Sequence, residues 1–531
     1  MTKLIINNSQ LARWGILPLW LLLTFSVFLR TPTPIDETRY LTVAWEMWLR
    51  QDFLVPYLNG ETYSHKPPLL FWLIQLSWGL FGVSEWAARL VGPVCALLNL
   101  YLVRLLAKKL WPDQENIALL APWVLIATLL WTLFATATMF DILLGSCVLL
   151  GMLGLVNASQ GHSLKGWSTL AIAIGLGVLA KGPVILVHLL PVALLMPLWI
   201  EKHQRVGYFR WYGFMLMAIL GGAVIALAWA IPAAIQGGEA YANAILWSQT
   251  ADRAVTSRLH ARPFWWYLPF LPLFIFPWVA WPRMWKCLIC MPWKNDQGIR
   301  FCSLWFISCL LIFSLIQSKQ VHYLVPILPA FSLLIARLLV NAEKAATWIS
   351  DLVLPLCFCA VGLFLILMPT MSVFAKLFWV QAMDFAWGGS VLIIGLALLG
   401  LTLYLRQLSI LAVSVSVVFS IVIGFFCFFK YTGLAYDLKP AAEKVKHLQA
   451  QGIPIAYVNN YQGQFHFLGG LTQPIDVVAY NQIISWASTH PDGYLMAVEK
   501  QKDTNVSYIQ RQRGRWLIFR TGRQTMQGQT K

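Results

Sequence analysis

Long runs of apolar residues alternate with short polar segments along most of this chain of 531 residues. A run of about 20 mainly apolar residues is long enough to cross a membrane as a helix. The pattern predicts about thirteen spanning helices, at 14–30, 86–106, 117–134, 140–157, 167–181, 184–200, 212–232, 264–282, 300–317, 322–340, 350–369, 388–405 and 408–429. The sequence therefore indicates a polytopic α-helical membrane protein.

Two connecting segments are much longer than the others, at 31–85 and 233–263. The first contains TVAWEMWLR, in which Glu46 and Arg50 form an i,i+4 pair beside apolar neighbours. It also contains PPLLFWLIQLSWGLF, which is apolar but too short to span. Both stretches are rich in Trp, which favours the membrane interface, so we expect helices that lie in that interface.

The pattern changes after about residue 430. KPAAEKVKHLQAQ predicts a helix, and IPIAYV, IDVVAY, YLMAVE and RWLIF predict short strands. We therefore divide the chain into a membrane domain, 1–430, whose long segments 31–85 and 233–263 lie on the outer side of the membrane, and a small α/β domain on the same side, 431–531.

Composition agrees with a membrane protein, because 59% of the residues are hydrophobic and only 11% are charged. Soluble domains carry about 25% charged residues. The net charge of +17 falls mainly on alternate connecting segments, as expected for cytoplasmic loops, and we infer no nucleic-acid partner. This alternation places the N-terminus in the cytoplasm and the C-terminal domain outside. The first apolar run lacks a small-residue cleavage site, so we expect it to be retained as a helix.

The nine cysteines lie mostly in spans or on the inner side, which excludes a disulfide framework. Cys287 and Cys290 form a C-x-x-C motif, but no second pair follows at the spacing of a zinc site.

Ionisable residues next to spans are costly and often functional. Here they gather on the predicted outer side of the membrane. The set consists of Asp36, Glu37, Arg39, His65, Lys66, Asp141, Lys181, His260, Arg262, Lys319, His322 and Tyr323. Segments far apart in the chain thus place ionisable side chains at one level of the membrane. This predicts a functional site on the outer side.

Two of these residues have structural alternatives. Asp141 stands alone among apolar neighbours and needs a cationic partner, so it is either functional or part of a structural ion pair. Lys181 precedes Gly182 and Pro183, which end the helix at the outer face. Its ammonium either binds a phosphate or extends to the interface. We interpret His188, within a span, as a hydrogen-bonded packing histidine and not as a ligand.

Seven motifs in this order, PIDETRY, YSHKPPLLFW, FGVSEWAARL, MFDILLG, LAKGP, LHARPFWWY and SKQVHYLVPILPA, carry a resemblance. The chain resembles bacterial GT-C glycosyltransferases related to protein O-mannosyltransferases, and most of all the 4-amino-4-deoxy-L-arabinose transferases that modify lipid A. The resemblance implies a GT-C fold in the bacterial inner membrane. It also implies transfer of a sugar from a polyprenyl phosphate carrier to an acceptor on the periplasmic face.

The resemblance also implies roles for matching residues. Asp36 resembles the catalytic acid of the first loop, and Asp141 resembles a second functional carboxylate. The substrate-binding candidates are Arg39 and Lys66 for the carrier phosphate, Tyr63 and Tyr323 as cavity-lining tyrosines, and Glu37, Lys181 and Lys319. His260 resembles a metal-contacting histidine.

One departure from the resembled pattern concerns the metal. The aminoarabinose transferases have Glu before Lys-Pro-Pro, where this chain has His65. Imidazole is a common zinc ligand, but no third ligand follows by spacing. Two alternatives stay open: a divalent metal, zinc or magnesium, held by His65 and His260, or no metal.

The residue types suit sugar transfer, because positioned Lys and Arg stabilise the negative charge that develops on a departing phosphate. A hydroxyl acceptor would need a base, and Asp36 or Asp141 could serve as this catalytic residue, whereas a phosphate of lipid A is already ionised. The acceptor is therefore lipid A, another glycan or a protein, and membrane lipids surround the site. Two alternatives remain: a protein O-glycosyltransferase, and a transporter or flippase for a lipid-linked sugar.

Overall fold

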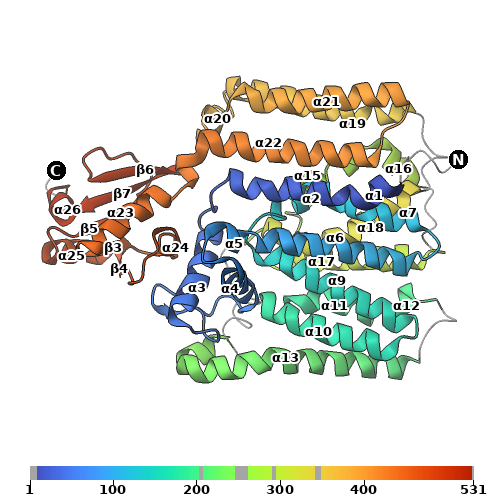
Figure 1. The fold of residues 1–531 in the computed structure, drawn as a ribbon, viewed down its shortest axis with the longest axis horizontal. Helices are drawn as coiled ribbons and strands as arrows, with labels where there is room; N and C mark the ends of the chain where they lie inside the picture. The colour runs from blue at the N-terminus through green and yellow to red at the C-terminus, as the bar shows by residue number, and fades with distance from the viewer. Residues whose placement is uncertain are drawn as a thin grey trace.

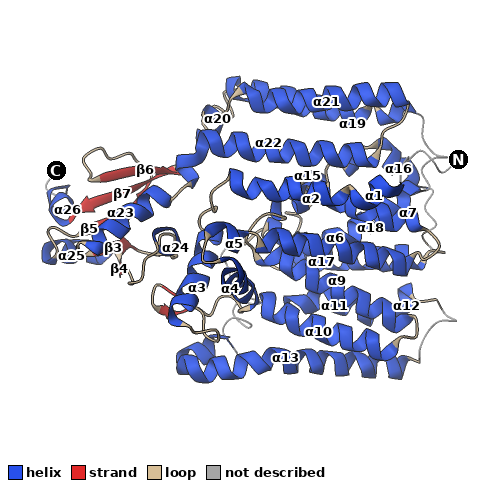
Figure 2. Ribbon diagram, in the orientation of Figure 1, coloured by secondary structure: helices blue, strands red, loops and turns tan. Residues whose placement is uncertain are grey.

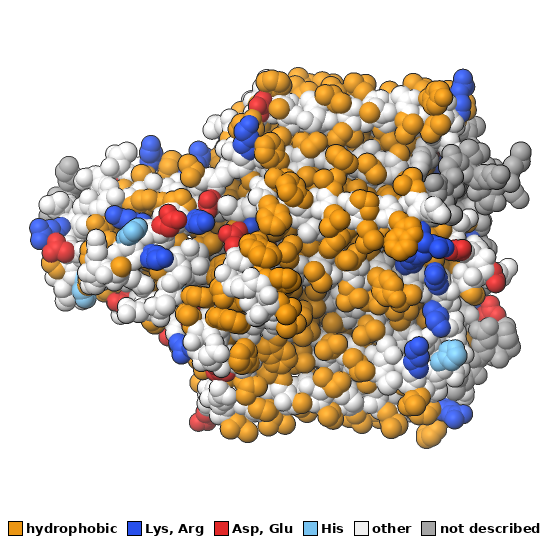
Figure 3. Space-filling view, in the orientation of Figure 1, with side chains coloured by type: hydrophobic (Ala, Val, Ile, Leu, Met, Phe, Trp, Pro, Cys, Tyr) orange, Lys and Arg blue, Asp and Glu red, His pale blue; other side chains and the backbone are white. Residues whose placement is uncertain are grey.

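A bundle of long helices carries a small α/β unit at one end in the computed structural model of this chain (Figures 1 and 2). The structure describes residues 9–201, 207–245, 261–289, 293, 295–340 and 348–528. Apolar side chains cover most of the face of the bundle seen in Figure 3, while Lys and Arg gather at the end farthest from the α/β unit. An apolar outer surface of this kind suits a lipid environment.

Ten helices in the described residues are long and apolar enough to cross a membrane. They are Gln10–Leu29, Glu85–Leu110, Phe140–Ser159, Ser163–Lys181, Tyr208–Asn243, Gln297–Leu315, Val321–Val340, Trp348–Thr370, Phe385–Leu405 and Ile410–Ala450. The corresponding elements are α1 (Ser9–Trp14), α2 (Ile16–Phe25), η1 (Ser26–Leu29), α5 (Glu85–Arg89), α6 (Val91–Leu110), α9 (Phe140–Ser159), α10 (Ser163–Lys181), α13 (Tyr208–Asn243), α17 (Gln297–Leu315), η5 (Val321–Ile327), α18 (Leu328–Val340), η7 (Trp348–Asp351), α19 (Val353–Leu367), η8 (Met368–Thr370), α21 (Phe385–Leu405), α22 (Ile410–Tyr436) and α23 (Lys439–Ala450).

The predicted count of thirteen spans is not confirmed, because three predicted runs are not continuous helices. Run 117–134 forms α7 (Glu115–Ile126) and α8 (Leu129–Phe134), and run 184–200 forms α11 (Val184–Leu194) and α12 (Met196–Trp199). Run 264–282 holds only the short helices α15 (Leu271–Phe274) and η4 (Trp278–Ala280).

Proline explains two of these interruptions, since it lacks an N–H and clashes with the preceding turn. Pro197 lies in the first turn of the new helix α12, which starts at Met196, and prolines recur through 263–282. The break in run 117–134 has a different cause. Thr128 is extended, and the next backbone N–H, of Leu129, donates to the carbonyl of Phe276 at 2.9 Å instead of continuing the helix.

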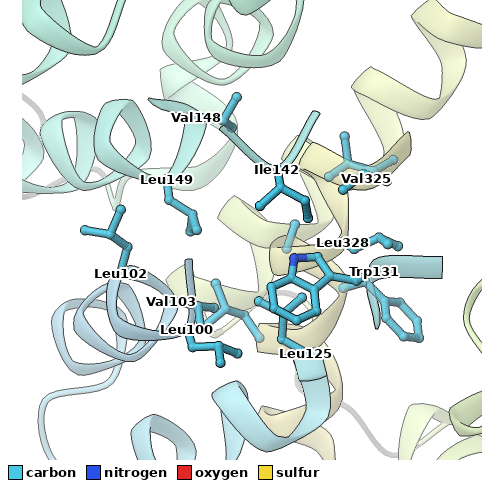
Figure 4. Packing of buried hydrophobic residues seen from close by; sticks show 14 of the residues in the cluster. Leu100, Leu102, Val103, Leu125, Trp131, Ile142, Val148, Leu149, Val325 and Leu328 are labelled. Atoms are coloured by element: carbon cyan, nitrogen blue, oxygen red, sulfur yellow. The ribbon is translucent and has the colours of Figure 1, made fainter. Parts of the chain in front are cut away.

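The core of the bundle is packed from apolar side chains of α6, α7, α8, α9, η5 and α18 (Figure 4). Helices α9 and α10 approach especially closely, because a Cβ at Gly166 would lie 2.5 Å from the backbone nitrogen of Ala158. Small residues permit such close approach between membrane helices. This antiparallel pair places the beginning of α9 beside the end of α10.

The segment between η1 and α5 lies at the end of the bundle near the α/β unit (Figure 1). It forms α3 (Asp36–Arg50), a short hairpin of β1 (Tyr57–Leu58) and β2 (Glu61–Thr62), and α4 (Leu69–Phe81). Both helices expected in this segment are therefore present. The second long segment begins as helix, because α13 continues to Asn243 through a kink at Gly238.

The remaining helical elements are short. They are α16 (Pro282–Ile289) and α20 (Phe378–Gln381) in the bundle, and α24 (His466–Gly469), η9 (Tyr480–Gln482), α25 (Ile483–Thr489) and α26 (Gly522–Gly528) in the α/β unit. The cysteines in the described ranges are free thiols, and Cys290 lies outside these ranges.

The α/β unit contains a five-stranded sheet with the order β4-β3-β5-β7-β6. Its strands are β3 (Ile455–Val458), β4 (Asp476–Val478), β5 (Tyr494–Glu499), β6 (Tyr508–Gln512) and β7 (Arg515–Thr521). Strands β4, β3 and β5 are parallel, whereas β7 is antiparallel to β5 and β6. The four predicted strands are all present, and β6 was missed because YIQRQ is mostly polar.

A buried ion pair joins the end of η1, the first turn of α3 and the turn that precedes α9. The side chains of Arg30 and Glu37 are only 4% and 3% exposed and form two hydrogen bonds with each other. Glu37 also accepts from the backbone N–H groups of Thr33 and Thr138, each at 2.8 Å, and Arg30 donates to the carbonyl of Thr136. This pair fixes the beginning of α3 against the beginning of α9.

These contacts correct the expectation that Glu37 binds substrate. Both of its carboxylate oxygens are occupied inside the protein, so the residue has a structural role. Burial alone would raise the pKa of Glu37, but the charge and hydrogen bonds of Arg30 lower it to about 2.

Replacing Glu37 with Gln is expected to lower the free energy of unfolding by about 3 kcal/mol, because Arg30 would remain buried without its counter-charge. Thermal unfolding of purified protein in detergent at pH 7 measures this change. Glu115→Gln is the matched control, since Glu115 and its partner Arg13 are 57% and 48% exposed. Equal losses of Tm in both variants would contradict the structural role of Glu37.

The same pair predicts a pH dependence. Folding lowers the pKa of Glu37 from its ordinary 4.5 to about 2. Its contribution to stability is therefore complete above pH 4.5 and is lost as the pH falls from 4.5 towards 2.

Candidate functional site

Asp36 is the first residue of α3, where a carboxylate is favoured by the free N–H groups of the helix. Its side chain is 49% exposed and accepts a hydrogen bond from Nη2 of Arg39 at 2.5 Å. Nη1 of the same guanidinium donates to Oε1 of Gln462, in the α/β unit, at 2.8 Å. Asp36 is thus an accessible carboxylate whose neighbouring cation is held from two sides.

A second carboxylate lies at the beginning of α9. Asp141 is almost fully buried, and one of its oxygens accepts from Nζ of Lys181, at the end of α10, at 2.5 Å. The helix break predicted at Gly182 is present, with φ +77° at that residue. The ion pair that we considered for Asp141 therefore exists, and its partner is Lys181, which lies inside the protein beside this carboxylate.

Aromatic rings connect the two carboxylates. Tyr40, next to Arg39, packs edge-on against Phe140, next to Asp141, with ring centroids 4.8 Å apart. Nζ of Lys66 lies 5.5 Å from the centroid of the Phe140 ring, and Nζ of Lys181 lies 4.9 Å from that of Tyr323. A cation over an aromatic face is attracted by the electrons of the ring. The rings therefore hold both ammonium groups near the carboxylates.

The charges of this region act on one another. Asp36, Lys66, Asp141 and Lys181 all lie within electrostatic reach of His322. Tyr63 and Asp36 lie within reach of Arg39. Burial, together with the nearby Asp36 carboxylate, raises the pKa of Tyr40, which stays a neutral phenol at physiological pH. The structure thus brings together Asp36, Arg39, Tyr63, Lys66, Asp141, Lys181 and Tyr323, which we call the charged cluster.

Lys319 is placed differently. It is 3% exposed, and its ammonium donates to the carbonyls of Arg262, at 3.0 Å, and of Ile316. Burial lowers its pKa. These bonds fasten the segment after α17 to Arg262, which indicates a structural role instead of the phosphate contact expected from the sequence.

Of the two expected metal ligands, the structure describes only His65. The centroid of its ring lies 5.3 Å from that of Tyr63, whereas His260 lies outside the described residues. Within the described ranges, no three His, Cys, Asp or Glu side chains form a group that could hold a metal ion. His188 is buried and packs against Phe313 as expected, but neither of its ring nitrogens has a hydrogen-bond partner within the described residues.

Sequence reasoning missed three contributors to the site. His322 was noted on the outer side but not chosen, although its position beside Tyr323 was a usable signal. Tyr40 and Gln462 gave no signal, because one is an ordinary aromatic residue of a helix and the other is a neutral residue far along the chain.

A cavity of about 330 Å³ lies nearby, between the end of α3, the hairpin and the α/β unit. It is lined by Glu46, Arg50, Gly60, His466 and Gln473, among others. Both oxygens of Glu46 are bound by backbone N–H groups of the hairpin, and burial lowers the pKa of His466 to about 4. The cavity is therefore distinct from the charged cluster and carries little net charge of its own.

Comparison with known proteins agrees with the resemblance found in the motifs. The family model described as dolichyl-phosphate-mannose-protein mannosyltransferase matches residues 65–235. An undecaprenyl phosphate-α-4-amino-4-deoxy-L-arabinose arabinosyl transferase of Pseudomonas fluorescens is 30% identical over 64% of this chain and 58% of its own length. One from Pseudomonas aeruginosa is 29% identical over 60% of this chain and 59% of its own. The matched region spans less than two thirds of these relatives.

Solved structures extend the likeness to nearly the whole chain. ArnT from Cupriavidus metallidurans bound to undecaprenyl phosphate has a TM-score of 0.76 and 18% identity, over 96% of this chain and 97% of that one. The same protein in the apo state has a TM-score of 0.74. The predicted fold class, a polytopic α-helical membrane protein with the GT-C fold, is therefore confirmed.

Asp141→Asn is expected to destabilise the protein by about 3–5 kcal/mol, because the ammonium of Lys181 would stay buried without a counter-charge. The double variant Asp141→Asn with Lys181→Met should lose less, since neither charge remains. Thermal unfolding of wild type, Asp141→Asn, Lys181→Met and the double variant completes a double-mutant cycle.

Glu115→Gln is the control for this cycle, because Glu115 and its partner Arg13 are 57% and 48% exposed. That change should cost about 0–1 kcal/mol. Additive losses from the two changes at Asp141 and Lys181 would refute the coupling of these residues.

Proposed function

We propose that this chain is an integral membrane glycosyltransferase. In this proposal it moves a sugar from a polyprenyl phosphate carrier, of the undecaprenyl type, to lipid A on the periplasmic face of the inner membrane. The observation that carries the proposal is the charged cluster, in which cations from three separate segments lie around two carboxylates. The fold shared with ArnT, described as bound to undecaprenyl phosphate, supports this choice of carrier.

The reaction begins with the donor bound through its phosphate. Arg39 and Lys66 are the primary contacts for this anion, and Lys181 adds positive charge beside Asp141. A guanidinium matches the geometry of phosphate oxygens, whereas an ammonium acts as a compact charge.

Transfer then occurs at the anomeric carbon. An acceptor oxygen forms a bond to this carbon while the bond to the phosphate oxygen breaks, and the electron pair leaves with the polyprenyl phosphate. The cations stabilise the charge that develops on this leaving group. Attack from the opposite face of the sugar inverts the configuration of the anomeric carbon.

Asp36 is the carboxylate best placed to act during transfer, because it is exposed and Asp141 is not. With an ionised phosphate of lipid A as acceptor, no base is needed. Asp36 would then orient the sugar or offset the positive charge that develops on it. With a hydroxyl acceptor, Asp36 would take the proton.

The orientation in the membrane follows from the distribution of charge. The basic end of the bundle, away from the α/β unit (Figure 3), fits the cytoplasmic side. In the proposed orientation the N-terminus lies in the cytoplasm, and the charged cluster and the α/β unit lie in the periplasm. A divalent metal at His65 and His260 stays a prediction.

Protein O-glycosylation is the second candidate, supported by the description of the family model that matches residues 65–235. The same cluster would serve it, with Asp36 as the base for a Ser or Thr hydroxyl. The fold shared with ArnT over 96% of this chain favours both transferases over a lipid-linked sugar transporter.

Mass spectrometry of lipid A tests the proposal in matched cells that express the wild-type chain, Asp36→Asn or Glu443→Gln. Wild type and Glu443→Gln, a change in α23, should add a pentosamine-sized or hexose-sized group. Asp36→Asn should reduce this product by about 100-fold or more, because it removes charge that stabilises the transition state.

Identical lipid A in all three strains, with every protein inserted in the membrane, would contradict lipid A as the acceptor. A sugar found instead on periplasmic proteins, and lost in Asp36→Asn, would favour the second candidate.

A further inference from the structure

We propose that Gln462 of the α/β unit is a positioning residue for Arg39, so that the periplasmic unit completes the phosphate-binding part of the site. This inference rests on the proposed function, in which Arg39 binds the carrier phosphate. It assigns a role in donor binding to a domain that otherwise contains none of the charged cluster.

The guanidinium of Arg39 is held by two partners of different character. Asp36 accepts from Nη2 at 2.5 Å, and Gln462 accepts from Nη1 at 2.8 Å. The Nε atom is buried and has no hydrogen-bond partner within the described ranges. A planar guanidinium held at both terminal nitrogens cannot rotate freely, so its direction towards a ligand is fixed in advance.

Gln462 is itself oriented by its neighbours. Its amide NH₂ donates to Oδ1 of Asn460, and its backbone N–H donates to Oε1 of Gln464 at 3.0 Å. Because the NH₂ group is bound to Asn460, the amide oxygen is the atom that points towards Arg39 and accepts its hydrogen bond. The orientation of this amide follows from the hydrogen bonds that it makes.

The loop that carries Gln462 is pressed closely onto α3. Thr42 donates through Oγ1 to the carbonyl of Gly463 at 2.5 Å. Gly463 has φ +73°, and a Cβ there would lie 2.8 Å from Cγ2 of Thr42, in α3. Glycine suits both this backbone conformation and this distance, so the close contact between the loop and α3 depends on Gly463. This contact holds Gln462 beside Arg39.

Further contacts anchor the unit at a distance from Arg39. Nε1 of Trp45 donates to the carbonyl of Leu471 at 2.9 Å. The side chain of Asn59 forms two hydrogen bonds with the backbone of Ile475, each at 2.8 Å. The unit is therefore docked on both α3 and the hairpin, and loss of one distant contact should leave Gln462 in place.

The neutral charge of Gln462 matters for an anionic ligand. Arg39 already faces the carboxylate of Asp36, which offsets part of its charge. A carboxylate at position 462 would place a second negative group on the same guanidinium and oppose a phosphate. An amide oxygen holds the guanidinium without adding this repulsion.

The experiment measures binding of undecaprenyl phosphate, and of undecaprenol as the phosphate-free probe, to the full chain in lipid nanodiscs. The variants are Gln462→Ala, Gln462→Glu, Arg39→Ala and the double variant Arg39→Ala with Gln462→Ala. Trp45→Phe is the matched control, because it removes the hydrogen bond to Leu471, a contact of the same unit that does not involve Arg39.

Gln462→Glu should weaken binding of undecaprenyl phosphate by about tenfold or more, and Gln462→Ala by a smaller factor, with undecaprenol unaffected. In the Arg39→Ala background, Gln462→Ala should have no further effect, since the residue acts only through Arg39. Trp45→Phe should bind as wild type does.

Four results would overturn the inference. Wild-type affinity in both variants at position 462 would leave Gln462 without a role. Equal weakening by Trp45→Phe and Gln462→Ala would show that Gln462 only helps to dock the α/β unit. An effect of Gln462→Ala that persists without Arg39 would show the same. Equal affinity of the wild-type protein for undecaprenol and undecaprenyl phosphate would instead refute the proposed function, and the inference with it.

Discussion

The buried ion pair between Arg30 and Glu37 determines where the rest of the site can lie. It holds the end of η1, the first turn of α3 and the turn before α9 in one hydrogen-bonded junction. Asp36 precedes Glu37 in the chain, and Asp141 follows the turn before α9. The junction therefore fixes the positions of both carboxylates. A buried pair gains stability only when its remaining hydrogen bonds are satisfied, and here the backbone N–H groups of Thr33 and Thr138 satisfy them.

Charge in the cluster is divided between an open part and a closed part. Asp36 and Arg39 are accessible, whereas Asp141 and Lys181 are paired inside the protein. The aromatic rings of Tyr40 and Phe140 separate the two pairs and carry Lys66 on one side. An anion that approaches the open part therefore meets cations whose positions are set before it arrives, and the closed part adds little cost of rearrangement.

The sequence predicted those parts of the molecule that depend on local pattern. α3, α4, the break at Gly182 and four strands of the α/β unit follow from periodicity, proline and glycine. The continuous spans at 117–134 and 264–282 failed because tertiary contact and repeated proline override apolar length. Ionisable residues at one membrane level were found from position alone. Their partners could not be predicted, because they depend on contacts between distant segments. These contacts bury Glu37, bond Lys319 to backbone carbonyls and bring Gln462 next to Arg39.

The central claim is that the charged cluster binds the phosphate of a polyprenyl carrier. Structure determination of the full chain in a nanodisc with undecaprenyl phosphate tests it most directly. The account predicts the phosphate in contact with Arg39 and Lys66, beside Asp36 and near the amide of Gln462. A phosphate located elsewhere, at the basic end of the bundle or in the cavity lined by Glu46 and His466, would contradict it.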